Sequence, residues 1–162
     1  MSEDTVPMTV KGKKKLEEDL KLYMSVERPN VIKAIEEARG HGDLSENAEY
    51  NAAKERQSYV EARIADINNK LSRAQVVDPS KLKSDKIVFG ATVVLEDINE
   101  NGKAKKVTYQ IVGVDEADAQ AGRLSIASPI ARALIGKAEG EIVSVTTPSG
   151  IKEFEVVEFS FE

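Results

Sequence analysis

A long, narrow stripe of apolar residues between positions 50 and 74 constrains this chain more than any other feature. Its members recur in alternating steps of three and four residues over more than three heptads, with one polar interruption at Gln57. They are Tyr50, Ala53, Val60, Ile64, Ile67, Leu71 and Ala74. Such a stripe is typical of a coiled-coil seam, so the sequence predicts one long helix whose apolar side must be covered by another helix. Tyr50 and Tyr59 are assigned to packing alone.

The segment before this stripe has the pattern of the partner helix. We expect residues 1–8 to be frayed, Thr9 to be the N-cap, and the helix to run over residues 11–39. Its apolar positions are Leu16, Leu20 and Tyr23, then Met24, Val31, Ile35 and Ala38. The stripe moves over by one position near Pro29, which lacks an amide proton and clashes with the preceding turn, so a kink is expected there. Two helices of about 30 residues joined by a short connection should form an antiparallel rod on the order of 45 Å long.

The connection, residues 40–50, reads Gly-His-Gly-Asp-Leu-Ser-Glu-Asn-Ala-Glu-Tyr. Asp43 and Glu46 have the spacing of a capping box, which predicts that they open the second helix. The same two acids, with Glu49, also place carboxylates close together, as in a half-site for a hard cation. Mg²⁺ is commonly held by only one or two protein carboxylates, with water or phosphate oxygens completing its shell. Both interpretations remain open on the spacing alone.

Composition excludes several classes of function. The 162 residues contain no cysteine and one histidine, which rules out disulfides, thiolate sites, His-rich metal clusters and thiol or triad catalysis. The net charge of -5 argues against nonspecific wrapping of nucleic acid and favours docking on another protein. No apolar run approaches the roughly 20 residues of a membrane span, and the N-terminus lacks the pattern of a signal peptide. We therefore expect a cytoplasmic protein with no membrane partner and no small-molecule substrate.

The second half of the chain has the pattern of a small sheet. The heptads stop at residues 76–86, a stretch with Pro79 and alternating charge, and β-rich segments follow at residues 87–95, 107–111, 124–126, 142–146 and 151–159. Ser128 and Pro129 form a cap and first-turn proline for one short helix, which Gly136 closes. The predicted fold is α+β: a helical coiled-coil hairpin over residues 1–78, a linker over residues 79–86, and a small antiparallel β domain with one short helix over residues 87–162.

The nine residues from Gly42 to Tyr50 resemble the tip motif of the bacterial Gre family of transcript-cleavage factors. The family pattern is also matched by Pro7-Met8-Thr9 with Gly12, by Arg28-Pro29, and by the ten residues 128–137. These segments together span nearly the whole chain. The sequence is therefore identified as a member of that family.

The resemblance implies an accessory transcription elongation factor, not an enzyme. Such a factor binds the secondary channel of RNA polymerase and stimulates the polymerase's intrinsic endonucleolytic cleavage of backtracked nascent RNA, which rescues arrested complexes. Asp43 and Glu46 would supply catalytic carboxylates in trans and hold a Mg²⁺ ion shared with the polymerase active site, with none bound stably by the chain alone. The alternative is a family member that occupies the channel and modulates or inhibits without promoting cleavage.

The resemblance also gives a role to three basic residues near the tip. Arg39, Lys54 and Arg56 would contact the 3′ end of the nascent RNA in a backtracked complex. The simpler interpretation is that they are solvated or pair with neighbouring acids; these acids are Glu36, Glu37 and Glu55.

The C-terminal half, by the same resemblance, has the fold of FK506-binding prolyl isomerases. An isomerase activity is disfavoured, because this half has no Trp and few aromatic residues to form a proline-binding basin. It is interpreted instead as the polymerase-docking domain. Ser128, Pro129 and Ile130 either form part of the docking surface or serve only for capping and core packing.

Overall fold

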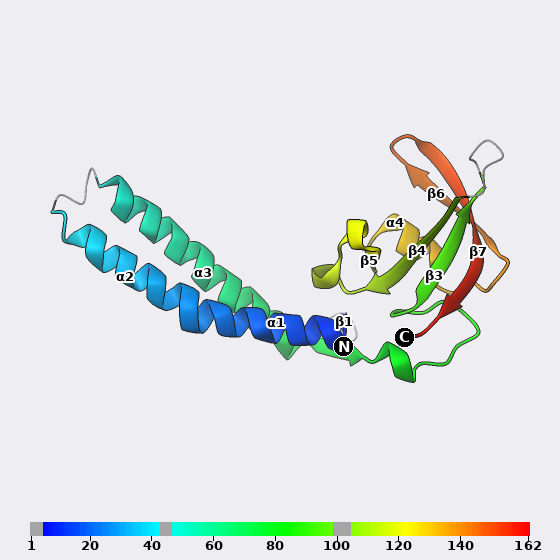
Figure 1. Cartoon of the computed structure of the whole chain (residues 1–162), viewed down its shortest axis with the longest axis horizontal. Helices are drawn as coiled ribbons and strands as arrows, with labels where there is room; N and C mark the ends of the chain where they lie inside the picture. The colour runs from blue at the N-terminus through cyan, green and yellow to red at the C-terminus, as the bar shows by residue number, and fades with distance from the viewer. Residues whose placement is uncertain (1–4, 43–46, 99–104) are drawn as a thin grey trace. The chain divides into compact units, whose positions relative to one another are not determined.

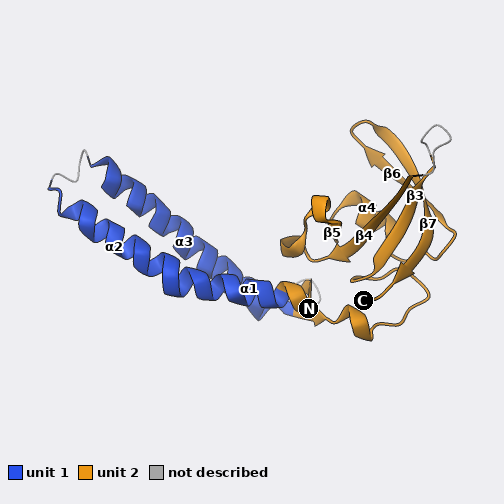
Figure 2. Ribbon diagram, in the orientation of Figure 1, with its two compact units in different colours: residues 1–4, 13–74 blue, residues 5–12, 75–162 orange. Residues whose placement is uncertain are grey.

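The computed structural model describes residues 5–42, 47–98 and 105–162, and the chain has the predicted α+β fold (Figure 1). The chain divides into two compact units (Figure 2). Residues 13–74 form the helical hairpin, and residues 5–12 join residues 75–162 in the C-terminal unit. No helix in the described ranges is both long enough and apolar enough to cross a membrane.

The first arm of the hairpin is one nearly continuous helical segment. It consists of α1 (Val10–Leu22), a π-helical segment (Tyr23–Glu27) and α2 (Arg28–Arg39). The second arm is α3 (Ala48–Ser72), which packs along α2 (Figure 1). The two helices bury a shared set of side chains; these are Val31, Ile35, Ala53, Val60 and Ile64. The predicted coiled-coil pairing is therefore confirmed.

The π-helical segment explains why the apolar stripe of the first arm shifts by one position. The Arg28 N–H donates to the Tyr23 carbonyl, five residues earlier, so this turn holds one residue more than an α-helical turn. The seam consequently passes from Tyr23 to Val31, eight residues later instead of seven. The prediction that Met24 belongs to the seam is wrong, because its side chain is 45% exposed. The π turn ends at Glu27, two residues before Pro29, and the kink expected at Pro29 stays a prediction.

Two ion pairs join the helices beside the seam. The Arg28 guanidinium donates to both carboxylate oxygens of Glu61 at 2.8 Å, and Arg56 pairs with Glu27 at 3.3 Å. The hydrogen bonds from Arg28 stabilise the ionised carboxylate and lower the pKa of Glu61. The pair therefore stabilises the hairpin only while Glu61 is charged.

The C-terminal unit contains a five-stranded sheet in the order β5-β4-β3-β7-β6. The strands are β3 (Thr92–Asp97), β4 (Lys105–Val112), β5 (Arg123–Ser125), β6 (Ile142–Thr147) and β7 (Gly150–Ser160). All neighbouring pairs are antiparallel except β4 and β5, which are parallel, so the prediction of a purely antiparallel sheet is wrong at this edge. Residues 113–122, with 3₁₀ turns at Val114–Glu116 and Ala119–Ala121, provide the crossover that a parallel pair requires.

One short helix packs against this sheet, as predicted. It is α4 (Pro129–Leu134), which contacts β6, and the Ser128 hydroxyl caps it by accepting from the Ala131 N–H at 3.2 Å. Gly136 follows the helix with a φ of 86°, which suits a glycine. The centre of the core is fully buried and consists of Ile87, Val93, Leu95, Ile111, Leu134 and Val156.

Residues 6–9 form a strand, where the sequence predicted a frayed end. β1 (Val6–Thr9) pairs with β2 (Ala74–Val77) in a two-stranded sheet, and a short 3₁₀ turn (Pro79–Lys81) follows β2. Met8 is only 2% exposed, which explains why the prediction of frayed residues 1–8 is wrong for this part. The predicted N-cap is confirmed, because the Thr9 hydroxyl accepts from the Gly12 N–H at 3.1 Å.

We predict that the contribution of Glu61 to hairpin stability disappears in acid. The lowered pKa means that this contribution is fully present above the unfolded value, about 4.3, and is lost as pH falls through the folded pKa. The free energy of unfolding of Glu61→Gln should therefore lie below that of the wild type at neutral pH and approach it in acid. Urea denaturation across a pH series measures this, with Glu55→Gln as the control on the same helix. A gap that stays constant with pH would contradict the assignment.

Candidate functional site

The tip of the hairpin begins where α2 ends. The Gly40 N–H still donates to the carbonyls of Glu36 and Glu37 at 3.2 Å, which closes the last turn of the helix. Gly42 has a φ of 98°, a conformation that glycine adopts without steric cost. The regular helix thus ends at Arg39, and Gly42 takes the left-handed conformation that begins the connection.

Asn47 joins the two helices at the tip. Its side-chain oxygen accepts from the Tyr50 N–H at 3.0 Å, which caps α3, and its amide nitrogen donates to the Ala38 carbonyl at 2.7 Å. The prediction that Asp43 opens the second helix is therefore wrong, because α3 begins at Ala48 with Asn47 as its N-cap. The sequence carried this signal, since Asn is among the preferred N-caps, but the capping-box spacing of Asp43 and Glu46 competed with it.

The two candidate metal ligands, Asp43 and Glu46, lie outside the described residues. Beside them in the sequence, Glu49 lies in the first turn of α3, and its carboxylate is 3.1 Å from Nδ1 of His41. Both of these side chains are exposed, with 58% of His41 and 73% of Glu49 accessible. The described part of the chain contains no group of three or more acidic or histidine side chains that could hold a metal ion. The magnesium hypothesis for Asp43 and Glu46 stays a prediction.

The three candidate RNA-contacting residues differ in their surroundings. Arg56 pairs with Glu27 and lies over the Tyr59 ring, 4.9 Å from its centroid. Lys54 donates to the Gln57 side chain at 3.2 Å, and Arg39 is exposed in the last turn of α2.

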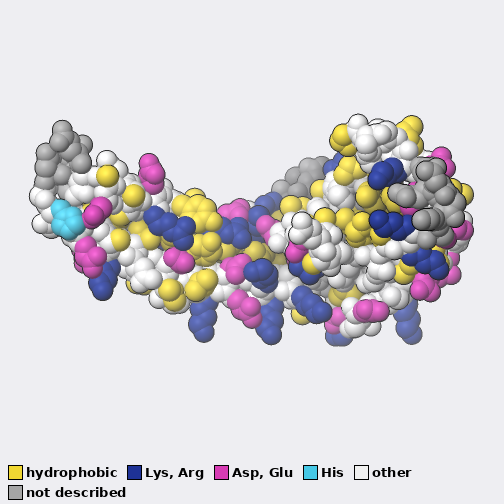
Figure 3. Space-filling model, turned by 45° about the horizontal axis from the view of Figure 1, so that its top comes forward, with side chains coloured by type: hydrophobic (Ala, Val, Ile, Leu, Met, Phe, Trp, Pro, Cys, Tyr) yellow, Lys and Arg dark blue, Asp and Glu magenta, His cyan; other side chains and the backbone are white. Residues whose placement is uncertain are grey.

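Arg56 thus pairs across the hairpin, and not with Glu36, Glu37 or Glu55. Figure 3 shows basic and acidic side chains interspersed along the hairpin, without one continuous basic surface on that face. An RNA contact by these residues stays a prediction, and Lys54 and Arg39 are the less constrained of the three.

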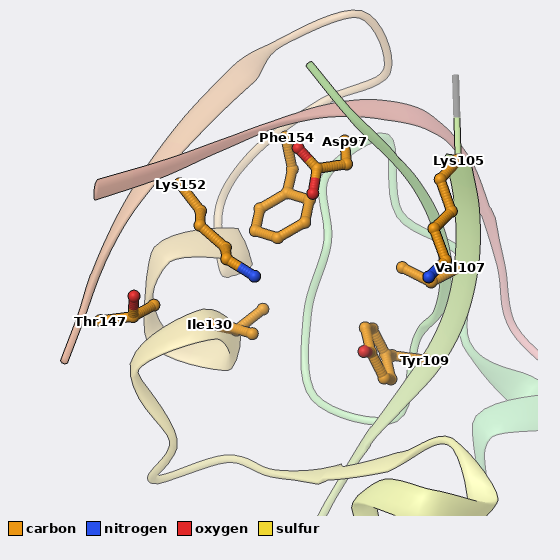
Figure 4. A pocket seen from close by; sticks show the side chains of 8 residues that line it. All are labelled: Asp97, Lys105, Val107, Tyr109, Ile130, Thr147, Lys152 and Phe154. Carbon is orange, nitrogen blue, oxygen red and sulfur yellow. The ribbon is translucent and has the colours of Figure 1, made fainter. Parts of the chain in front are cut away.

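The C-terminal unit has a pocket of about 260 Å³ next to α4 (Figure 4). Apolar side chains and three charged ones line it; they are Val107, Tyr109, Ile130, Phe154, Thr147, Asp97, Lys105 and Lys152. Phe154 is 7% exposed and belongs to the core, as expected, but it also lines this pocket together with Tyr109. Of the three candidate docking residues, Ile130 lines the pocket directly, Ser128 caps α4 and Pro129 is exposed at its first position. Sequence reasoning had not foreseen this pocket.

The two halves of the chain each match a family of transcription elongation factor domains, and the two matches together span most of its length. Residues 6–76 match the family "Transcription elongation factor, N-terminal", and residues 82–161 match "Transcription elongation factor, GreA/GreB, C-term". The chain belongs to the GreA/GreB family of transcription elongation factors. The membership inferred from the tip motif and the C-terminal signature is thereby confirmed, and with it a general role in transcription elongation.

Individual members of the GreA/GreB family are similar along nearly their whole length. A transcription elongation factor GreA of Phenylobacterium zucineum is 57% identical over 153 residues, which cover 94% of this chain and 96% of the relative. A second, from Alkalilimnicola ehrlichii, is 55% identical and covers 96% and 98%. Among solved structures, the GreA factor homolog 1 (Gfh1) of Thermus thermophilus is 28% identical, covers 96% of this chain and 98% of its own, and has a TM-score of 0.43.

We predict that Asn47 stabilises the tip through both of its hydrogen bonds. Asn47→Ala removes the cap and the link to Ala38, and should cost about 1 kcal/mol or more of hairpin stability. Asn47→Asp keeps the capping oxygen and loses only the donor to Ala38, so its cost should be intermediate. Amide hydrogen exchange at Tyr50 measures the cap directly, and equal exchange in the wild type and Asn47→Ala would show that Asn47 does not cap α3.

Proposed function

We propose that this protein binds RNA polymerase in its secondary channel and stimulates the polymerase's intrinsic cleavage of backtracked RNA. The observation that carries the proposal is the match to the GreA/GreB family in both units, together with a helical hairpin whose connecting sequence contains Asp43 and Glu46. At 1.5 Å per residue, the 25 residues of α3 extend about 38 Å, so the tip can reach a catalytic centre that the C-terminal unit itself never approaches.

The role of the tip is to bring Asp43 and Glu46 to the polymerase. Carboxylate oxygens are preferred ligands of Mg²⁺, and a second magnesium ion at a phosphodiester activates water for in-line attack. The two acids precede the N-cap of α3, where the helix dipole favours negative charge. Because Asn47 already caps α3, this helix does not need either carboxylate for its start. The acids can therefore serve the ion in trans.

The basic residues near the tip would contact the phosphates of the RNA end. Lys54 and Arg39 are exposed and can turn toward RNA, whereas Arg56 would first have to leave Glu27 and the Tyr59 ring. Phosphate contacts of this kind are electrostatic and weaken as salt rises. We therefore assign the larger share of the RNA contact to Lys54 and Arg39.

The C-terminal unit would dock on the polymerase through the surface around Ser128, Pro129 and Ile130. The support is the pocket beside α4, whose aromatic and aliphatic walls can receive an apolar side chain of the partner. Lys105 and Lys152 line the same pocket and would favour an acidic flank on that partner. Ile130 lines this pocket and would contact the partner's apolar side chain directly.

The second candidate function is a family member that occupies the channel without stimulating cleavage. The presence of both tip acids favours the cleavage factor over this alternative. Incubating the protein with stalled elongation complexes and looking for shortened RNA separates the two functions.

We predict that Asp43→Asn and Glu46→Gln fold normally, compete for the polymerase like the wild type, and lose most of the stimulated cleavage. An amide is a poorer magnesium ligand than a carboxylate and carries no charge. The double variant should be little worse than the weaker single one, because both groups act on one ion. Raised Mg²⁺ should partly restore the single variants by mass action.

The control for these variants is Glu49→Gln, which removes an equal charge from the same tip and should retain cleavage. RNA shortening, competition with wild type and melting temperature are measured for each variant at several magnesium concentrations. Near-wild-type cleavage by Asp43→Asn would remove that residue from the metal site. The protein alone should cleave no RNA, since two acids without a fixed substrate cannot position an in-line attack.

We predict that Ile130→Ala weakens binding to the polymerase at least about fivefold, the effect of losing an interface anchor worth about 1 kcal/mol. Ile130 is only half-buried, so the core should tolerate the change. Competition with labelled wild-type protein measures the affinity, and Ile142→Ala, on the exposed side of β6, is the matched control. If both variants compete equally well, residues 128–130 serve only for capping and core packing.

A further inference from the structure

Glu116 holds the start of α1 inside the C-terminal unit. Its carboxylate lies at the end of the 3₁₀ turn after β4 and accepts from the N–H groups of Thr9 at 2.9 Å and Gly113 at 3.0 Å. The Thr9 hydroxyl also donates to the other oxygen of the same carboxylate. One acid therefore receives three hydrogen bonds, two of them from a residue that is 107 positions away in the sequence.

The residues around Glu116 are buried or closely packed against it. Thr9 is only 4% exposed, so water is a poor replacement partner for its amide and hydroxyl. A Cβ atom at Gly12 would overlap the Glu116 carboxyl group, and a Cβ atom at Gly113 would lie 2.6 Å from the Pro7 carbonyl oxygen. Both glycines are thus required by the close approach of the two segments, and the anchor is a tightly packed feature of the unit.

The hydrogen bonds continue from Glu116 into the helix. The Thr9 hydroxyl donates to Glu116 and also accepts from the Gly12 N–H. The same hydroxyl is therefore the N-cap of α1. The chain passes from the C-terminal unit into the hairpin between Gly12 and Lys13, inside α1, and returns between Ala74 and Gln75, inside β2. The first crossing lies within α1, so the turn that Glu116 contacts belongs to the same helix that continues into the hairpin.

We infer that Glu116 is a positioning residue, which limits the freedom of the hairpin by anchoring its first helical turn. The inference rests on the proposed function, in which one unit docks and the other delivers Asp43 and Glu46 to a catalytic centre. Misplacement of catalytic groups by about 1 Å can cost on the order of a hundredfold in rate, so a loosened base should lower cleavage without weakening docking. Glu116 itself touches neither RNA nor metal.

Both oxygens of the Glu116 side chain act as acceptors in this arrangement. Glu116 accepts all three hydrogen bonds, and a carboxylate has acceptor capacity on both oxygens. A glutamine amide has only one oxygen and would point a donor at the Thr9 hydroxyl. Glu116→Gln should therefore weaken the anchor while keeping the volume of the side chain, and Glu116→Ala should remove it.

The freedom of the hairpin can be measured without polymerase. The chain has no cysteine, so two introduced cysteines at the exposed positions Glu37 and Lys83 take spin labels specifically, one in each unit. The distribution of distances between the labels should broaden in Glu116→Ala and, to a lesser extent, in Glu116→Gln. The control, Glu139→Gln, removes an exposed glutamate of the same unit and should leave the width unchanged.

The same variants are then tested with backtracked complexes. Glu116→Ala should compete for the polymerase within about twofold of wild type, and its maximal cleavage at saturating protein should fall at least about tenfold. Thr9→Val should repeat both effects, because it lacks the hydroxyl, whereas Thr9→Ser should behave as wild type.

The outcomes separate this inference from the proposed function. An unchanged distance distribution in Glu116→Ala and Thr9→Val, with intact amide protection in β3, would overturn the anchor. Broadening without any loss of maximal cleavage would overturn the positioning role. If the wild type stimulates no cleavage, the proposed function fails, and the label distances still decide whether Glu116 anchors the helix.

Discussion

The packing of two apolar stripes against each other is the interaction on which the hairpin depends. The buried cluster of this unit joins α2 and α3, and Leu20 and Tyr23 from the earlier part of the first arm pack against it. Each helix is held along one narrow side, so the opposite sides stay polar and the rod stays thin. The hairpin is therefore held together along its length by this one seam.

The periodicity of the sequence predicted this hairpin well, but not its local hydrogen bonds. The stripe over residues 50–74 predicted the pairing of α3, although its last member, Ala74, lies in β2 and not in the helix. Near Pro29 the sequence predicted a kink and did not indicate a π turn. The cap of α3 was assigned to Asp43 because two capping signals lie four residues apart, and spacing cannot rank them. The structure favours Asn47, since its amide can serve Ala38 on one helix and Tyr50 on the other at once.

Alternation of side chains predicted the strands of the C-terminal unit, and the features it missed are non-local. β5 lies parallel to β4, and β1 pairs with a strand more than sixty residues later. The residues of one strand do not indicate which strand it pairs with, because the pairing depends on the path of the chain between the two strands. The pocket and the contact between Thr9 and Glu116 have the same origin. For the tip acids, the sequence supplied a family motif and a charge argument, and their metal role stays a prediction.

Acidic residues contribute differently to the folded structure in the two units. Substitutions of these residues should therefore affect activity in one unit and stability in the other. At the tip, Asn47 joins both helix ends with a neutral side chain, so the charges of Asp43 and Glu46 are not needed to start α3. In the C-terminal unit, Glu116 accepts hydrogen bonds from the backbone of the buried Thr9 and from Gly113, so its carboxylate is part of the folded structure. A neutral substitution should therefore act on function alone at the tip, and on the anchoring of α1 at Glu116. The start of α3 thus rests on the neutral Asn47, whereas the start of α1 rests on the hydrogen bonds that the Glu116 carboxylate accepts.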